Sequence, residues 1–150
     1  MKTEPNTYSW QDLVQEKVTS WEGVRNYQAR NFMRDDMKVG DLVFIYHSVV
    51  KPMTIMGIAE VVREAYPDHF AFEEGHRYFD PKSKKDNPAW MMVDVAVNKS
   101  FKNPITLDRL KSIPGLEQMM LLQKGSRLSI QPVSKDEWQI ICSLEKQLSV

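Results

Sequence analysis

Short apolar runs, each bounded by turn residues, divide the middle of the chain. Such runs are typical of strands that are buried on at least one face. Gly57 interrupts one run, which indicates a bulge or a close backbone approach, and Pro132 ends another. The pattern predicts strands within residues 39–48, 54–65, 90–101 and 127–132.

Helix-start patterns lie at the margins of these runs. Ser9 is placed to cap a helix with Asp12 three residues later, and Ser134 and Glu137 have the same capping-box spacing. Thr106 is a suitable cap for a short helix between them. Strands in the middle with helices at the margins predict an α+β fold, a curved sheet or small β-barrel flanked by helices.

The composition is that of one ordinary globular domain, residues 1–150. Hydrophobic residues make up 42% of the chain, which argues against disorder. Twenty basic and twenty acidic residues give no net charge, so a polyanion needs a local basic patch to bind. Cys142 is the only cysteine, and no apolar run is long enough to span a membrane. We expect a cytoplasmic monomer without a cofactor.

The segment WEGVRNYQARN, residues 21–31, is rich in groups that stack on flat rings or bind polar edges. If it is helical, Tyr27, Arg30 and Asn31 share one face. Two interpretations stay open. In the first, the arginines are solvated or paired with neighbouring acids while the aromatic residues pack. In the second, Trp21 and Tyr27 offer ring faces, and the arginines and asparagines bind a nucleobase and its phosphates.

Two further segments offer polar or basic groups. Residues 76–90 carry four basic and two acidic side chains with aromatic residues between them. A solvated loop is the default interpretation of this segment, and it is also the best local anion patch. In FIYHS, residues 44–48, side chains alternate between the two faces of a strand. Burial accounts for Phe44, whereas the residues near the strand end are better placed to reach a cavity: Tyr46, His47 and Ser48.

Residues for metal or covalent chemistry are not grouped in the sequence. His47, His69 and His76 lie in different segments without the spacing of a zinc site. Cys142 lies beside apolar positions of the last expected helix, so packing accounts for it better than nucleophilic chemistry does. His47 and Ser48 are neighbours in a strand, point to opposite faces and cannot form a catalytic pair. We therefore expect no metal site and no catalytic residue.

Several segments together resemble the EVE domain family: MKTEP, WEGVRNYQARNFMRDDMKVGDLVFIYHS, GIAEVVREAYPD, YFDPKS, PAWMMVDV and RLSIQPVSKDEW. They occur in family order and cover nearly the whole chain. The family has a PUA-like fold, related to the YTH readers of methylated adenine and to SRA and ASCH domains, so the resemblance implies a barrel-like sheet flanked by helices. Family members usually have Ser at the position of Thr3 and start a few apolar residues earlier, so the first strand is expected to be short.

The resemblance also implies a non-catalytic reader that flips a modified base into an aromatic-lined pocket, from modified DNA (a 5-substituted cytosine) or modified RNA. Trp21 or Tyr46 is expected to stack on the base. Asn26, Asn31 and Ser48 are expected to bind its polar edge. Expected phosphate contacts are Arg25, Arg30, Lys82 and Arg127. Carried over by position, the ligand-binding residues are Lys2, Thr3, Trp21, Val24, Arg25, Asn26, Tyr27, Arg30, Asn31, Tyr46, His47, Ser48, Asp80, Pro81, Lys82, Ser83, Arg127, Leu128 and Ser129.

Two other functions stay open from the sequence. One is binding of a small molecule, such as a free nucleoside or an anionic metabolite, in the same pocket. The other is an enzyme that acts on a modified base, against which the missing metal-ligand and nucleophile patterns argue.

Overall fold

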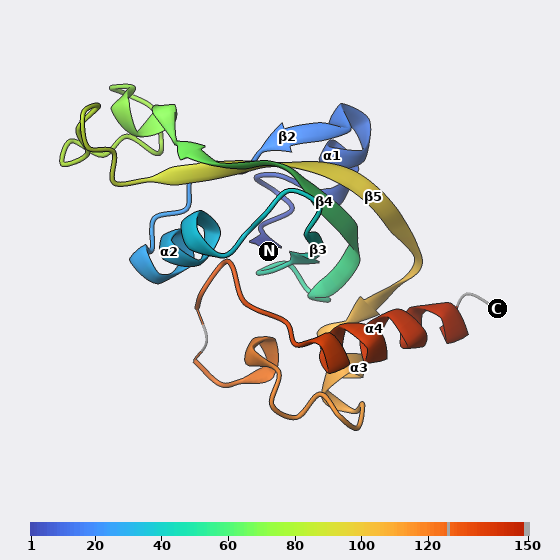
Figure 1. Cartoon of the computed structure of the whole chain (residues 1–150). Coiled ribbons are helices and arrows are strands. Elements are labelled where there is room, and N and C mark those ends of the chain that lie inside the picture. The colour runs from blue at the N-terminus through green and yellow to red at the C-terminus, as the bar shows by residue number, and fades with distance from the viewer. Residues whose placement is uncertain (126, 149–150) are drawn as a thin grey trace.

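A single mixed sheet carries the fold and curves around the N-terminal segment (Figure 1). The structure is a computed structural model that describes residues 1–125 and 127–148. The strand order is β1-β3-β4-β5-β2, with β1 parallel to β3 and the other pairs antiparallel. The sheet is not closed into a barrel. Its strands are β1 (Lys2–Thr3), β2 (Val18–Ser20), β3 (Leu42–His47), β4 (Thr54–Pro67) and β5 (Met91–Thr106).

Two long strands bend the sheet. β4 and β5 pair over most of their length, with several shifts of register that mark bulges. One shift falls at Gly57, where an added Cβ would come within 2.5 Å of the Lys99 carbonyl oxygen and of the Trp10 ring. The prediction of a bulge or a close approach at Gly57 is confirmed, and both are present.

The three helices that the sequence predicts begin at their predicted caps. α1 (Trp10–Glu16) is capped by Ser9, whose hydroxyl accepts from the Asp12 N–H, while the Asp12 carboxylate accepts from the Ser9 N–H. Thr106 caps α3 (Leu107–Lys111), and Ser134 and Glu137 exchange the same pair of bonds at α4 (Lys135–Leu148). The remaining helical elements are α2 (Tyr27–Asp35), η1 (His69–Phe72) and η2 (Met120–Leu122).

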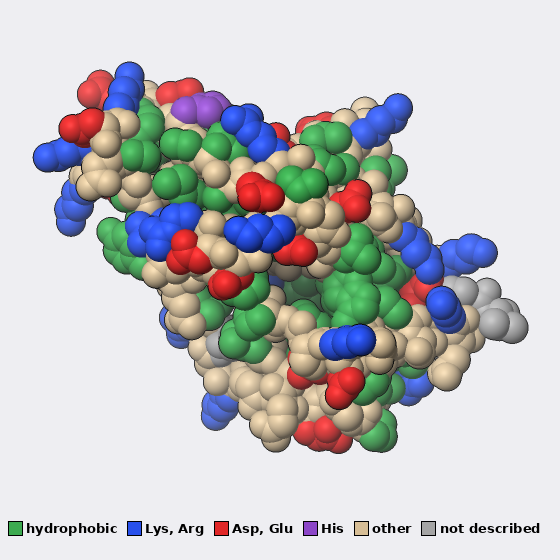
Figure 2. All heavy atoms as spheres, in the orientation of Figure 1, with side chains coloured by type: hydrophobic (Ala, Val, Ile, Leu, Met, Phe, Trp, Pro, Cys, Tyr) green, Lys and Arg blue, Asp and Glu red, His purple; other side chains and the backbone are tan. Residues whose placement is uncertain are grey.

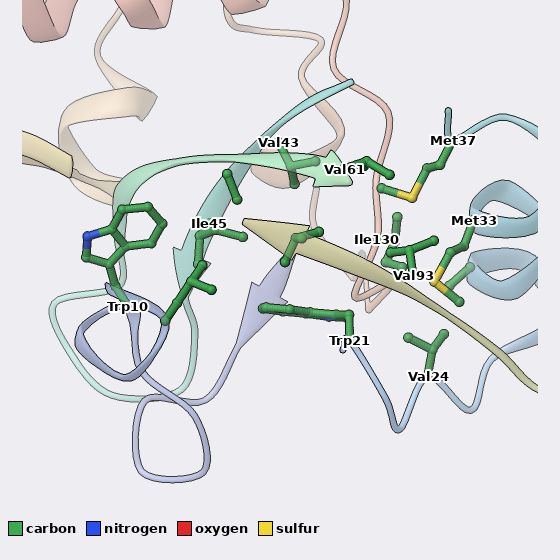
Figure 3. Packing of buried hydrophobic residues seen from close by; sticks show 14 residues of the cluster. Trp10, Trp21, Val24, Met33, Met37, Val43, Ile45, Val61, Val93 and Ile130 are labelled. Carbon is green, nitrogen blue, oxygen red and sulfur yellow. The ribbon is translucent and has the colours of Figure 1, made fainter. Parts of the chain in front are cut away.

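The core is divided by β3 into two clusters, because alternate side chains of this strand point to opposite faces. Val43 and Ile45 belong to the first cluster, and Phe44 and Tyr46 to the second. In Figure 3, Trp10 lies at one end of the first cluster, with the methionines of the α2 side at the other and Trp21 between them. From Val43 onward, both faces of β3 are therefore buried.

One predicted strand is wrong. Residues 127–132 run alongside the N-terminus, where the Lys2 N–H donates to the Ser129 carbonyl at 2.8 Å, but they form no strand. The apolar alternation of this segment instead reflects burial of Ile130 in the first cluster. In the described part of the chain, no helix is long and apolar enough to cross a membrane.

Candidate functional site

Three segments distant in the sequence meet at the edge of the sheet that β1 forms. β1 pairs with the end of β3, which sets Lys2 opposite Tyr46 and Thr3 opposite His47. The Thr3 carbonyl accepts from the Ser48 N–H at 2.9 Å and from the Ser48 hydroxyl at 3.3 Å. With the Lys2–Ser129 bond, these contacts join several of the predicted residues, here called the N-terminal edge: Lys2, Thr3, Ser48, Leu128 and Ser129.

A small cavity of about 30 Å³ lies beneath the N-terminal edge, with room for about one water molecule. Lys2, Tyr46 and Ser129 contribute to its lining, and its other lining residues are mostly apolar. Burial lowers the pKa of the Lys2 ammonium group and raises the pKa of the Tyr46 phenol. Tyr46 belongs to the second core cluster, whereas Trp21 belongs to the first, so the two predicted stacking residues do not lie in the same cluster.

Trp21 is a core residue with a small accessible surface. It directly follows β2, and its backbone N–H donates to the Val93 carbonyl at 2.7 Å. Only 8% of the residue is exposed. Tyr8 packs edge-on against its ring, with the centroids 6.2 Å apart. Replacing Trp21 by alanine would therefore cost about 3–5 kcal/mol of stability, so that substitution does not separate binding from folding.

His47 holds the start of α1. Its Nε2 accepts from the backbone N–H of Trp10 at 2.9 Å. This bond requires a neutral imidazole ring with its proton on Nδ1. Burial lowers the pKa of His47 and so favours that neutral form. The His47 side chain was expected to reach a cavity. In the structure, its Nε2 is instead bonded to the first residue of α1.

Arg25, a predicted phosphate contact, is bonded within the protein. Its guanidinium donates to the Asp68 carboxylate at 3.0 Å and to the Tyr78 carbonyl at 2.7 Å. It also lies 5.4 Å from the ring centroids of both Tyr78 and Trp90. Asp68 is fully buried and accepts from the Gly23 and Phe70 N–H groups as well. The sequence predicted a phosphate contact for Arg25 and did not predict its pairing with Asp68, which lies 43 residues away.

Tyr27 and Trp90 form a stack at the start of α2. The rings lie 4.8 Å apart; Trp90 is buried, whereas Tyr27 is 60% exposed. The Arg30 guanidinium lies 4.8 Å from the Tyr27 ring and donates to the Ala89 carbonyl. Together these side chains join α2 to the loop before β5, and we call them the arginine–aromatic cluster: Arg25, Tyr27, Arg30, Tyr78 and Trp90.

The two asparagines have local roles around α2. The Asn26 side chain caps the helix by accepting from the Ala29 N–H at 3.0 Å. The Asn31 side-chain oxygen accepts from the Arg30 guanidinium. Both residues are exposed, and Val24 beside them is buried in the first core cluster.

The predicted loop residues mostly hold the loop in shape. Asp80 accepts from the Trp90 indole N–H at 2.6 Å and from the Lys82 N–H, and these bonds lower its pKa. The Ser83 hydroxyl accepts from the Ala89 N–H. Pro81, Lys82 and Arg127 are exposed. Figure 2 shows a central hollow on one face of the molecule, with hydrophobic side chains beside it and charged side chains above it.

The comparisons with known proteins identify the family. A model of the EVE domain matches residues 1–144. The chain belongs to the EVE domain family. This EVE domain is 42% identical to human thymocyte nuclear protein 1, over 98% of its own length and 73% of the human protein.

Solved structures of relatives have the same fold. A Pseudomonas putida protein is 45% identical, with a TM-score of 0.93 and 97% of each chain covered. Human THYN1, crystallised in complex with DNA that contains 5-methylcytosine, is 43% identical, with a TM-score of 0.91, 97% of this chain and 95% of that chain covered. These structural neighbours are PUA-like, so the predicted fold class is confirmed for this EVE domain.

Two residues that shape the region were not predicted. Tyr8 packs on Trp21, and its carbonyl accepts from the Thr3 hydroxyl at 2.6 Å. Asp68 anchors Arg25 and Gly23. The only local signal for Asp68 was an acidic residue directly after Pro67, shortly beyond the strand expected at residues 54–65. Among the described residues, no group of three His, Cys, Asp or Glu side chains is arranged to hold a metal ion.

Proposed function

We propose that this EVE domain binds nucleic acid that carries a modified base, with 5-methylcytosine in DNA as the first candidate. The observation that carries the proposal is the human relative of the same fold in complex with 5-methylcytosine DNA. The family relationship covers most of the chain, which supports transfer of the ligand class.

The N-terminal edge is the proposed place for the base. It offers the hydroxyl of Ser48, whose bond to the Thr3 carbonyl is long at 3.3 Å and can be redirected at small cost. Tyr8 packs edge-on against the Trp21 ring, so a base that stacks on Trp21 has to displace Tyr8 or a neighbour. Stacking contributes about 1–3 kcal/mol per base, which offsets the few kcal/mol needed to flip it.

The phosphates are proposed to meet exposed cations around this edge. Arg127, two residues before Ser129, is exposed and fits that role. Lys82 is exposed in the loop before β5, and the Arg25 guanidinium is already paired with buried Asp68. Because the chain has no net charge, a few local contacts would carry the electrostatic part of binding. We therefore expect a weaker salt dependence than that of strongly basic DNA-binding proteins.

We further propose that the domain binds without chemistry. His47 uses Nε2 to accept from the Trp10 backbone, and burial raises the pKa of the Cys142 thiol, which keeps it protonated at neutral pH. Neither group is poised as a base or a nucleophile.

Fluorescence anisotropy tests the proposal, with duplexes that differ only in one 5-methyl group and with the matching methylated and unmethylated RNA, at fixed salt. We expect tighter binding of the methylated DNA, and about fivefold or greater loss of that affinity in Trp21→Phe, which keeps most of the packing. Trp10→Phe is the matched control, because Trp10 is a 3% exposed tryptophan of the same core cluster.

Equal affinity of the unsubstituted protein for methylated and unmethylated cytosine in both nucleic acids would contradict the proposed function. Equal loss in Trp21→Phe and Trp10→Phe would remove Trp21 from the binding site while leaving the ligand class in place.

A further inference from the structure

The turn between β3 and β4 presents two valines to solvent. Val49 is 66% exposed and Val50 is 40% exposed, and exposed Lys51 and Pro52 follow them. Exposing apolar side chains to water at a loop tip is unfavourable for the free energy of folding. A turn that only had to reverse the chain would have polar or glycine residues here.

The backbone at Val49 is strained as well. Its φ is +71°, in the left-handed region that β-branched residues rarely adopt. Glycine or asparagine would take this conformation at lower cost. Both its exposure and its backbone conformation therefore disfavour a valine at position 49. Backbone strain of this kind is concentrated at functional sites.

Hydrogen bonds hold the turn on both sides of the valines. The Val50 N–H donates to the Ser48 carbonyl at 2.8 Å, and the Thr54 hydroxyl donates to the Pro52 carbonyl at 2.7 Å. On the other side, Ser48 is bonded to Thr3 through both its N–H and its hydroxyl. The tip is therefore a braced projection that begins directly at the N-terminal edge.

We propose that Val49, with Val50 beside it, is a wedge that enters the DNA duplex and fills the space vacated by the flipped base. The inference rests on the proposed function, because it requires a base to leave the stack. Apolar side chains serve as wedges between base steps in other DNA-binding proteins. Lys51, adjacent and exposed, supplies a cation for the phosphate next to the gap.

The test compares a duplex with a single strand, because only the duplex leaves a gap beside a partner base. Both carry one 5-methylcytosine, and anisotropy gives the affinity of each at the same salt. Val49→Asn removes the apolar wedge and relieves the left-handed strain; Val49→Ala removes most of the side chain but keeps the strain. Val39→Asn is the matched control, because Val39 is an exposed valine, at 58%, in another turn.

We expect Val49→Asn and Val49→Ala to weaken duplex binding by about tenfold, with single-strand affinity unchanged and with Val39→Asn unchanged on both. Val49→Asn should melt no lower than the unsubstituted protein, so its loss of binding is not a loss of folding. Unchanged duplex affinity in both Val49 variants overturns the wedge, and so does an equal loss on the single strand. If the unsubstituted protein shows no preference for 5-methylcytosine on either ligand, the proposed function fails, and the wedge with it.

Discussion

The arginine–aromatic cluster and the N-terminal edge differ in how fully their polar groups are used within the chain. In the cluster, Arg25 is bonded to Asp68 and Tyr78, and Arg30 to Ala89 and Asn31. These contacts fasten the loop before β5 to α2. At the N-terminal edge, backbone bonds join three segments while the Ser48 hydroxyl makes only a long contact.

Under the proposed function, composition alone is a poor guide to the binding surface. The cluster has the arginines and rings that suit a nucleobase site, yet those groups already bind one another and the backbone. Composition does not single out the residues of the N-terminal edge, and its Ser48 hydroxyl makes only one long bond, at 3.3 Å. We therefore expect substitutions in the cluster to act mainly on stability and substitutions at the edge to act mainly on binding.

Breaking the anchor of the cluster should give the largest effect. Asp68→Ala leaves the Arg25 guanidinium and the Gly23 and Phe70 N–H groups without their carboxylate partner. We expect a loss of about 3–5 kcal/mol in the free energy of unfolding, measured by urea denaturation, as for other ion pairs with a buried member. Asp35→Ala, which breaks the exposed pair with Arg34, is the control and should cost less than about 1 kcal/mol.

Similar losses in the two aspartate variants would mean that Arg25 is not a structural residue. In that case the guanidinium would be available for the phosphate contact that the sequence predicted.

Acid should weaken the link between His47 and α1. The folded-state pKa of His47 is lowered by burial, so the unfolded chain, with a pKa of about 6.5, takes up the proton first. This contribution to stability is complete above about pH 6.5 and falls as the pH drops through the folded-state pKa. His47→Gln, whose carbonyl can accept the same Trp10 bond, should flatten this part of the stability–pH curve.

Urea denaturation from pH 8 to pH 5 measures the effect, and losing the buried bond altogether is expected to cost about 1–3 kcal/mol. His69→Gln is the control, because it removes an exposed histidine that pairs with Glu73 and does not contact α1; the contribution of His47 should persist in it. If His47→Gln retains the full slope, another group controls the acid response.

Local and distant interactions explain what the sequence could predict. The caps at Ser9, Thr106 and Ser134 were predictable, because each cap and its partner lie three residues apart. The pairing of Arg25 with Asp68 was not predictable, because Asp68 lies 43 residues away and is brought near only by the sheet. The bond between Trp10 and His47 spans 37 residues and was missed for the same reason.

The candidate site was predictable mainly through the family resemblance. Position in the family pointed to Thr3 and Ser129, which their composition did not distinguish, whereas Ser48 was also indicated by its place near the end of the FIYHS strand. The false strand at residues 127–132 has a related cause: its apolar residues pack against the sheet, and periodicity does not distinguish packing from strand pairing.

Ser48→Ala should have the smallest effect on stability and therefore sharpens the comparison most. The variant keeps the 2.9 Å bond from the Ser48 N–H to the Thr3 carbonyl and loses only the 3.3 Å bond from the hydroxyl. We expect less than about 1 kcal/mol of destabilisation, but a loss of about three- to tenfold in affinity for 5-methylcytosine DNA, as for one lost hydrogen bond to a ligand. Ser112→Ala, which removes an exposed 2.7 Å bond to the Arg109 carbonyl, is the matched control and should leave affinity unchanged. The opposite outcome is a Ser48→Ala protein that is clearly destabilised but binds normally. The N-terminal edge would then be structural, like the arginine–aromatic cluster, and the base would have to bind elsewhere on the domain.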